Sequence, residues 1–307
     1  MKILVTGACG FLGRNLSERL VACGHLVRAF DVYRAPFVGQ DGIEFVEGNL
    51  LDGGALARAV MGCDAVVHLA CNVVPKTSNA NPCLDIENNL CGSVRLLEAA
   101  VGNNIKRFVF VSSGGTVYGV PKTLPIPEGH PTNPDCSYGI TKLAIEKYIG
   151  MYQRERGLSA CTLRIANLYG EWQRPNSAQG AVAVFCHKAL TGKTIDVWGD
   201  GSVIRDYVYV GDAVSSILLA LENDKAAGEI NIGSGVGTSI NELLDAIDSV
   251  VGSKATRNYL PGRVFDVPAN VLDVSKAKAM LGWQPEMKLV NGIGRTVEWM
   301  RSNGLVS

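Results

Sequence analysis

Tyr138 and Lys142 are the two side chains whose types and spacing best fit acid–base chemistry. They are four residues apart in a stretch with helical periodicity, Tyr138 to Arg156, so they share one face of the predicted helix. A lysine ammonium beside a tyrosine favours the phenolate, which can take the proton of an alcohol or sugar hydroxyl while hydride leaves the carbon. Alone, this spacing is more typical of a solvated helix face, so its weight depends on its surroundings.

A glycine loop near the N-terminus supplies those surroundings. The apolar run Ile3 to Val5 leads into Gly7, Gly10 and Gly13, and a helical pattern begins at Phe11. The first glycine allows the tight turn, the second lets the backbone approach a pyrophosphate, and the third permits close helix–sheet packing. The helix N-terminus then favours an anion. The loop therefore predicts a dinucleotide site.

Asp31 indicates which dinucleotide this site binds. The loop has the spacing G-x-x-G-x-x-G rather than G-x-G-x-x-G, but Asp31 ends the next predicted strand, about 20 residues on. Its carboxylate can accept a hydrogen bond from a ribose 2′-hydroxyl and would repel a 2′-phosphate, which favours NAD over NADP. The alternative is an ordinary strand–turn–helix connection in which Asp31 is a surface charge. Strand, glycine loop and acid together favour the cofactor site.

Short apolar runs alternate with helical stretches through the first half of the chain. Strands alternating with helices predict an α/β fold with a parallel sheet covered on both faces. The strands of such a sheet are continuous apolar runs, as in Phe108–Val111. The predicted strands are Ile3–Val5, Leu26–Phe30, Ile43–Val46, Ala65–Leu69, Phe108–Val111, Cys161–Ile165 and Glu229–Ile232, and the main predicted helices are Phe11–Cys23, Ile86–Val101 and Tyr138–Arg156.

After Arg164 the pattern becomes more polar and richer in turns. Residues 170–180 are polar, a helix is expected from Ser239, and the C-terminal part shows loops and short helices. We therefore expect a cofactor domain over residues 1–165, to which 206–233 return. A smaller substrate-binding lobe is expected from residues 166–205 and 234–307.

Composition excludes several other classes of protein. Lysine plus arginine equals aspartate plus glutamate at 29 each, so nothing suggests a nucleic-acid or membrane-surface partner. The nine cysteines show no C-x-x-C spacing, so we expect small buried hydrophobes in a reducing compartment and no metal site. The chain enters an apolar strand at once, without a signal-peptide pattern, and no apolar run is long enough to span a bilayer. These features predict a cytoplasmic protein.

Taken together, the motifs resemble those of the extended short-chain dehydrogenase/reductases, and among them the nucleotide-sugar epimerases typified by UDP-glucose 4-epimerase. The resemblance covers nearly the whole chain and implies a doubly wound parallel Rossmann sheet with a smaller C-terminal substrate-binding lobe. The residues that carry it are Thr6–Gly13, Asp31, Gly48–Leu50, His68–Ala70, Asn89 with Gly92, Ser112–Gly119, Tyr138 with Lys142, Asn167, Arg205–Tyr207, and Arg263 with Asp266.

The resemblance implies roles in binding NAD. Backbone amides of Phe11 and Leu12 would meet the pyrophosphate, and Asn49 and Leu50 would flank the adenine. Asn49 stands where the family usually has aspartate, and it keeps an acceptor there. The cofactor contacts implied in this way are Gly7, Gly10, Phe11, Leu12, Gly13, Asp31, Asn49, Leu50, Leu69, Ala70, Asn89, Tyr138, Lys142 and Ala166.

Substrate contacts follow from the same resemblance. Arginines would hold the diphosphate, because the guanidinium fork matches paired phosphate oxygens. For an arginine considered alone, surface ion pairing is the commoner role. Asn270 occupies the position that gates the sugar pocket in the family. The implied substrate contacts are Asn167, Gln179, Arg205, Arg263 and Asp266, the last on the ribose.

The sequence departs from the family at the catalytic hydroxyl. Relatives carry serine or threonine three residues before Val117, where this chain has Gly114. If the stretch is extended, Ser112, Gly114 and Thr116 point the same way. Thr116 is then the first candidate for the missing hydroxyl and Ser113 the second. A third possibility is that no side chain fills the role.

The resemblance implies C4 epimerisation of a nucleotide-diphosphate sugar of the UDP-glucose/galactose type. Hydride passes from C4 to NAD, a 4-keto sugar forms, and hydride returns to the other face. Tyr138 acts as base and then as acid, while Lys142 lowers its pKa and holds the nicotinamide ribose. NAD is regenerated without net consumption.

Other functions remain open from the sequence. A 4-keto-sugar reductase consuming NAD(P)H would use the same scaffold. A 4,6-dehydratase fits less well, because those relatives carry an Asp-Glu pair after the catalytic threonine and this chain does not. An NAD-sensing binding protein without catalysis would usually lack the Tyr138–Lys142 pair. By analogy with the family, Ile86–Val101 and Tyr138–Arg156 would pair across a two-fold axis in a homodimer.

Overall fold

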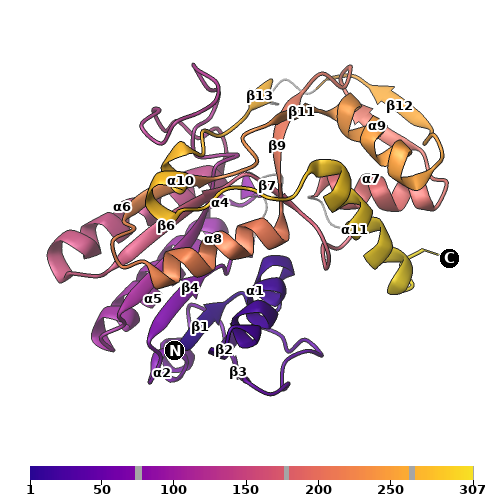
Figure 1. Ribbon diagram of the computed structural model, residues 1–307. Helices are drawn as coiled ribbons and strands as arrows, with labels where there is room; N and C mark the ends of the chain where they lie inside the picture. Colours follow the sequence, from indigo (N-terminus) through magenta and orange to yellow (C-terminus); the bar gives the residue numbers. More distant parts are fainter. Residues whose placement is uncertain (73–77, 176–179, 263–266, 307) are drawn as a thin grey trace.

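A parallel sheet of seven strands forms the centre of the computed structural model, which describes residues 1–72, 78–175, 180–262 and 267–306 (Figure 1). The strand order is β10-β6-β5-β4-β1-β2-β3, and every neighbouring pair is parallel. The bounds are Lys2–Thr6 (β1), Leu26–Asp31 (β2), Ile43–Glu47 (β3), Ala65–His68 (β4), Arg107–Ser113 (β5), Ala160–Ile165 (β6) and Gly228–Ile232 (β10). All seven strands predicted from apolar runs are confirmed.

Helices cover both faces of this sheet, which confirms the doubly wound α/β fold. Alternate residues of one strand serve two cores: Ile3 and Val5 belong to the cluster under α1 and α8, and Leu4 to the cluster under α2, α5 and α6. Both clusters are buried, as a two-sided parallel sheet requires. The helices are α1 (Phe11–Ala22), α2 (Gly53–Val60), α5 (Gly92–Gly102), α6 (Ser137–Arg156) and α8 (Val210–Glu222).

The helix predicted over residues 86–101 begins earlier and is not uniform. Asn81 caps the short helix α4 (Pro82–Asp85), because its side chain accepts a hydrogen bond from the Leu84 amide and Pro82 suits a first helical position. A π-helical segment, η1 (Ile86–Cys91), then leads into α5. Wide turns of this kind often lie at functional sites. Here the segment carries Asn89, which reaches the cofactor cavity described below.

Smaller sheets and helices gather to one side of the large sheet (Figure 1). Strand β9 pairs with β7, β11 and β13, and β8 pairs with β12. Ser239 and Glu242 form a capping box at the start of α9, which confirms the helix predicted from Ser239. The C-terminal part is less irregular than predicted, because α11 has 14 residues. The remaining elements are β7 (Asn167–Tyr169), α7 (Ala181–Leu190), β8 (Ile195–Trp198), β9 (Ile204–Tyr209), β11 (Gly237–Ser239), α9 (Ile240–Val251), β12 (Arg257–Leu260), β13 (Ala269–Asn270), α10 (Ser275–Leu281) and α11 (Leu289–Ser302).

The cysteines are all free thiols, and only some of them are buried. Cys9, Cys63, Cys161 and Cys186 lie in the interior, whereas the other five are at least partly accessible. The prediction of uniformly buried cysteines is therefore wrong, since four of the nine side chains are exposed. Within the described ranges, no helix is long and apolar enough to cross a membrane, and no cluster of His, Cys, Asp or Glu could hold a metal ion.

Candidate active site

Two cavities meet at the carboxyl ends of the central strands, the usual location of sites in open parallel sheets. One, of about 400 Å³, is lined by the glycine loop after β1. The other, of about 480 Å³, extends toward the smaller sheets. Phe11, Val111 and Tyr138 line both cavities. The Tyr138 side chain therefore stands where the two spaces join.

The glycine loop is shaped by contacts that exclude side chains. Gly7 has a φ of +70°, and a Cβ there would lie 2.8 Å from the backbone of Ala70. A Cβ on Gly13 would lie 2.1 Å from the carbonyl oxygen of Gly7. Helix α1 begins after Gly10 with no side-chain cap and no acidic residue in its first turn. Its N-terminal amides are thus available to an anion such as a pyrophosphate.

Asp31 lies at the end of β2, next to this loop. One carboxylate oxygen accepts a hydrogen bond from the Cys9 amide at 2.9 Å, and the other accepts from the Val32 amide at 2.8 Å. Two fixed donors hold the carboxylate in place, and each oxygen keeps a further lone pair for a ribose hydroxyl. The anion site and the oriented acid together fit a dinucleotide.

Most of the residues predicted to contact the cofactor line this cavity. The structure brings thirteen of the fourteen predicted cofactor residues to its wall. Ala166 is the exception, because it lines the second cavity instead. The Asn49 side chain already accepts a hydrogen bond from the Leu51 amide at 2.9 Å. Sequence reasoning missed Tyr33, Cys71, Asn72 and Asn88, which also line the wall but lie in no spaced motif.

His68 lies buried at the end of β4. Its two ring nitrogens are 2.7 Å from the Thr6 hydroxyl and 2.8 Å from the Ser93 hydroxyl. Burial lowers the pKa of this imidazole from 6.5 to about 3. The folded protein therefore keeps His68 neutral over the whole neutral and mildly acidic range.

This burial predicts a loss of stability in acid. Between pH 6.5 and 3 the unfolded chain binds a proton at His68 that the folded chain does not, so the free energy of unfolding falls as pH decreases below 6.5. By pH 5 the loss from this residue is about 2 kcal/mol. Urea unfolding at pH 7 and pH 5 measures it, and His68→Gln should lose correspondingly less between the two. An equal loss in both proteins would contradict the assignment.

Tyr138 and Lys142 share one face of α6 beside β5, where Lys142 is buried and Tyr138 is half-buried. The Lys142 ammonium donates to the Val111 carbonyl at 2.9 Å and lies 5.7 Å from the centre of the Tyr138 ring. Burial raises the pKa of Tyr138 and lowers the pKa of Lys142. The prediction that the lysine brings the pKa of Tyr138 below its ordinary value is therefore wrong for the chain by itself, because desolvation dominates.

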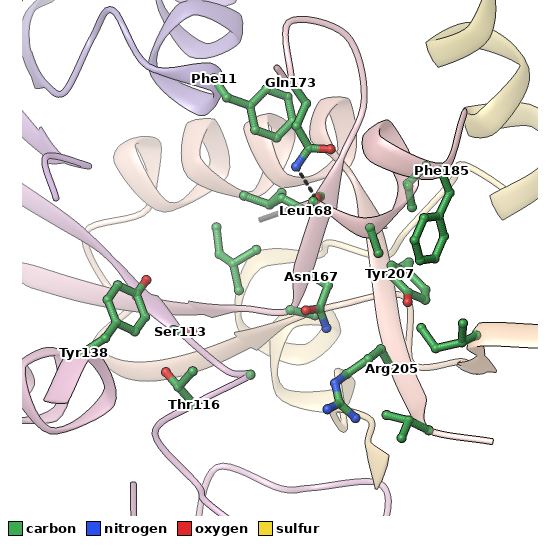
Figure 2. Close-up of a pocket in the computed structure, with 18 of the residues that line it drawn as sticks. Phe11, Ser113, Thr116, Tyr138, Asn167, Leu168, Gln173, Phe185, Arg205 and Tyr207 are labelled. Carbon is green, nitrogen blue, oxygen red and sulfur yellow. Dashed lines mark hydrogen bonds between the residues drawn. The ribbon is translucent and has the colours of Figure 1, made fainter. Parts of the chain in front are cut away.

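The hydroxyls near Tyr138 occupy different environments. The nearby Ser113 side chain lowers the pKa of Tyr138, against the larger effect of burial. The Thr116 hydroxyl oxygen is buried and has no hydrogen-bond partner among the residues that the structure describes. Both residues line the second cavity, with Thr116 near Tyr138 in Figure 2. Gly114 does not line it.

Helix α6 is tied to the end of β5 at two successive turns. Lys142 bonds Val111, and one turn later Glu146 accepts a hydrogen bond from the Ser112 hydroxyl at 2.6 Å. Arg164 of β6 pairs with Glu146 at 2.6 Å, and both side chains are almost completely buried. This network fixes the strand that carries Ser113 relative to the helix that carries Tyr138. Sequence reasoning missed it, although the spacing Y-x-x-x-K-x-x-x-E places Glu146 on the catalytic face.

The second cavity takes its walls from several separate elements (Figure 2). Asn167 of β7 donates to the backbone oxygen of Asp206 at 3.0 Å. Arg205 of β9 donates to the carbonyls of Ile204 and Val267 at 2.9 and 2.7 Å. Both predicted substrate residues thus lie on the cavity wall. The predictions for Gln179, Arg263 and Asp266 lie outside the described residues.

Gln173 is a wall residue that sequence reasoning missed. Its amide nitrogen donates to the Leu168 carbonyl at 3.0 Å, as Figure 2 shows. Its amide oxygen is buried and finds no partner within the described part of the chain. A buried acceptor on a cavity wall is suited to a ligand donor. In the sequence, its position in the polar stretch 170–180 could have indicated that Gln173 lies on the cavity wall.

Asn270 differs from its expected position. It is 2% exposed and is not part of the cavity wall described here. Its amide nitrogen instead donates to the Gly114 carbonyl at 3.2 Å. Asn270, which was expected to gate the sugar pocket, therefore holds the loop between β5 and α6 through a hydrogen bond instead.

These features define a dinucleotide enzyme on a Rossmann sheet, and comparison with known proteins is more specific. Residues 3–233 match the model of the NAD dependent epimerase/dehydratase family. The match spans well over half of the chain. The chain belongs to this family and is an NAD-dependent enzyme, which confirms the resemblance seen in the sequence.

Individual relatives agree over nearly their whole length. The UDP-glucose 4-epimerase of Mycolicibacterium smegmatis is 38% identical, with 98% of this chain and 99% of the relative covered. The Thermotoga maritima UDP-glucose 4-epimerase, solved with UDP-glucose, has a TM-score of 0.94 at 36% identity, covering 99% of both chains. The Thermus thermophilus UDP-glucose 4-epimerase, solved with NAD, has a TM-score of 0.89 at 33% identity, covering 98% of this chain and 99% of that one.

Proposed function

We propose that this protein epimerises a nucleotide-diphosphate sugar of the UDP-glucose/galactose type at C4, with NAD as its cofactor. The observation that carries the proposal is the position of Tyr138, which lines both the glycine-loop cavity and the second cavity. A base at this junction can reach a sugar whose carbon faces the cofactor. The names of the M. smegmatis and T. maritima relatives support the choice of substrate.

In this mechanism the glycine-loop amides and Asp31 would hold NAD, which would supply a ring able to accept hydride from C4 and to return it. Tyr138 takes the proton of the 4-hydroxyl as that carbon is oxidised and gives it back when the carbon is reduced. The 4-keto sugar must present its other face before reduction. Positive charge at the junction, from Lys142 and from the oxidised cofactor, favours the phenolate and opposes the effect of burial.

We assign the two hydroxyls different tasks. Ser113, whose side chain lowers the pKa of Tyr138, would orient the phenol. Thr116 would offer its hydroxyl to the sugar, because this residue lines the second cavity and its hydroxyl oxygen has no partner in the described part of the chain. Such a donor is most useful where negative charge develops on the 4-oxygen. Thr116 therefore fills the role that Gly114 leaves open.

Replacing Thr116 by valine is expected to lower kcat about 10²-fold, since one donor to a developing oxyanion is removed. The shape of the side chain is kept, so retained NAD and the melting temperature should stay close to those of the natural protein. The matched control is Thr191→Val, whose hydroxyl donates to the His187 carbonyl at the end of α7. Unchanged turnover in Thr116→Val would refute the assignment.

The second cavity is proposed to hold the nucleotide sugar. Asn167 and Arg205 are assigned to the diphosphate, and Gln173 to a sugar hydroxyl through its unpartnered oxygen. Gln179, Arg263 and Asp266 remain predictions from the family resemblance. In this proposal residues 1–165 and 206–233 serve the cofactor, and residues 166–205 and 234–307 serve the substrate.

The test is to incubate purified protein with UDP-glucose, UDP-galactose and their N-acetyl forms without added reductant. Interconversion of one pair is expected, and no reaction with any nucleotide sugar would refute the proposal.

A second candidate is a 4-keto-sugar reductase. The dTDP-4-dehydro-6-deoxyglucose reductase of Escherichia coli is 29% identical over 97% of both chains. Stoichiometric loss of NADH with a 4-keto sugar would favour that function.

Apolar side chains exposed on α4, η1 and α6 favour a homodimer. Leu84 and Ile86 precede α5, while Ile140 and Tyr148 lie on α6, and each is at least 40% exposed. Helices α4 and η1 pack against α6, and apolar side chains exposed on neighbouring helices are typical of a protein–protein interface. We propose that these helices pair with those of a second copy. Light scattering should give twice the mass of one chain, and a monomer mass would contradict the pairing.

A further inference from the structure

Position 114 requires glycine because a neighbouring side chain fills the space, and not because of its backbone conformation. Its φ lies outside the left-handed region, so the backbone itself accepts other residues. A Cβ built there would lie 2.5 Å from Cδ1 of Leu272, closer than real Cβ contacts occur. It would also lie 3.1 Å from the carbonyl oxygen of Arg164. Leu272 thus occupies the space of a side chain at position 114.

Leu272 has little freedom to move away. Its side chain is completely buried. Its amide donates to the Asp206 carboxylate at 3.2 Å. On either side, the Val271 carbonyl accepts from the Ile126 amide at 2.8 Å and the Asp273 amide donates to the Ile126 carbonyl at 3.0 Å. A leucine held in this way resists overpacking, since close-packed interiors give way only at a cost.

Two hydrogen bonds to its backbone also hold Gly114 in place. Its amide donates to the Ile165 carbonyl at 2.9 Å, and its carbonyl accepts from Asn270 at 3.2 Å. Asn270 and Leu272 belong to one short segment, which therefore contacts Gly114 through a hydrogen bond and through packing. Two residues beyond Gly114, Thr116 lines the second cavity, and its buried hydroxyl has no partner among the described residues.

We infer that Leu272 is a positioning residue that takes the place of the catalytic side chain expected at position 114 and so assigns the hydroxyl role to Thr116. A serine at 114 together with a small residue at 272 would be the equivalent arrangement, since it would leave room for the hydroxyl that the family resemblance places there. The assignment of the hydroxyl role rests on the proposed function.

The first experiment compares Gly114→Ser, Leu272→Ala and the double variant by melting temperature, retained NAD and turnover of UDP-glucose. Gly114→Ser should lower the melting temperature by about 5 °C, because overpacking a core site is destabilising. It should also lower kcat at least 50-fold. The double variant should recover most of the melting temperature and a kcat within fivefold of the natural protein.

A matched control is the same change at the next residue. A Cβ on Gly115 would have the Ser113 hydroxyl at 3.9 Å as its nearest neighbour, so that position is open. Gly115→Ser should leave the melting temperature unchanged, with or without Leu272→Ala. A Gly114→Ser protein as stable and active as the natural one would overturn the inference, as would a double variant no better than Gly114→Ser.

The second experiment removes the Thr116 hydroxyl in both backgrounds. Thr116→Val should cost less than threefold in kcat when serine occupies 114 and alanine occupies 272, but about 10²-fold in the natural chain. An equal loss of kcat in the two backgrounds would overturn the inference that Thr116 has taken over the hydroxyl role. If the natural chain converted no nucleotide sugar, the proposed function would fail, and melting temperature and retained NAD would still decide whether Leu272 excludes a side chain at 114.

Discussion

Replacing Tyr138 by phenylalanine is expected to lower kcat for nucleotide-sugar interconversion about 10³-fold, with little change in KM. The ring still fills the junction of the two cavities, but no group remains there to move the proton of the 4-hydroxyl. General acid–base catalysis by one side chain is worth about 10²- to 10⁴-fold. Retained NAD should not change, because the glycine loop and Asp31 are untouched.

The matched control is Tyr148→Phe on the same helix, a tyrosine that lines neither cavity and loses only its hydroxyl. Its turnover should stay within about twofold, as expected for a surface change. Steady-state kinetics on both variants checks the assignment. Turnover of Tyr138→Phe at the natural rate would show that another group moves the proton.

Replacing Arg164 by leucine is expected to lower the free energy of unfolding by about 3–5 kcal/mol, because Glu146 would be left as an unpaired buried charge. The Arg164 and Glu146 side chains are only 3% and 0% exposed, so water cannot take the place of the lost partner. The arginine also donates to the Tyr118 hydroxyl at 3.0 Å, and that bond is lost too.

The double variant Arg164→Leu with Glu146→Leu should lose less stability than Arg164→Leu alone, because it removes both charges. Urea unfolding at pH 7 measures all three proteins. A loss below about 1 kcal/mol for Arg164→Leu would mean that the buried charge is tolerated, contrary to the network described here. The folded single variant should also have a lower kcat, since Glu146 loses the partner that fixes it and therefore holds Ser112 and the end of β5 less firmly.

The fold and the cofactor cavity were predictable because their signals are local. Continuous apolar runs predict buried parallel strands, as in Phe108–Val111, and the central sheet confirms them. The glycine loop and Asp31 are joined by one strand–helix–strand unit, so their spacing in sequence determines their spacing in the fold. By contrast, a proline and an asparagine cap set the start of α4, and the apolar period beyond Ile86 gives no indication of them.

The second cavity was less predictable because its walls come from segments far apart in the chain. Gln173, Phe185 and Trp198 reach it from three separate elements, with no shared spacing. The burial that raises the pKa of Tyr138 also depends on tertiary packing. The reason for glycine at 114 is Leu272, more than 150 residues away in sequence. Such pairings appear only once the strands and loops are in place.

The most direct test of the proposed chemistry follows the hydrogen at C4. Purified protein is incubated with UDP-glucose carrying deuterium at C4, without added reductant, and the UDP-galactose formed is analysed by NMR and mass spectrometry. The account predicts an equilibrium mixture in which deuterium is retained at C4 of both sugars, because the hydrogen removed from this carbon is returned to it. Loss of deuterium to solvent during interconversion, or no interconversion at all, would contradict it.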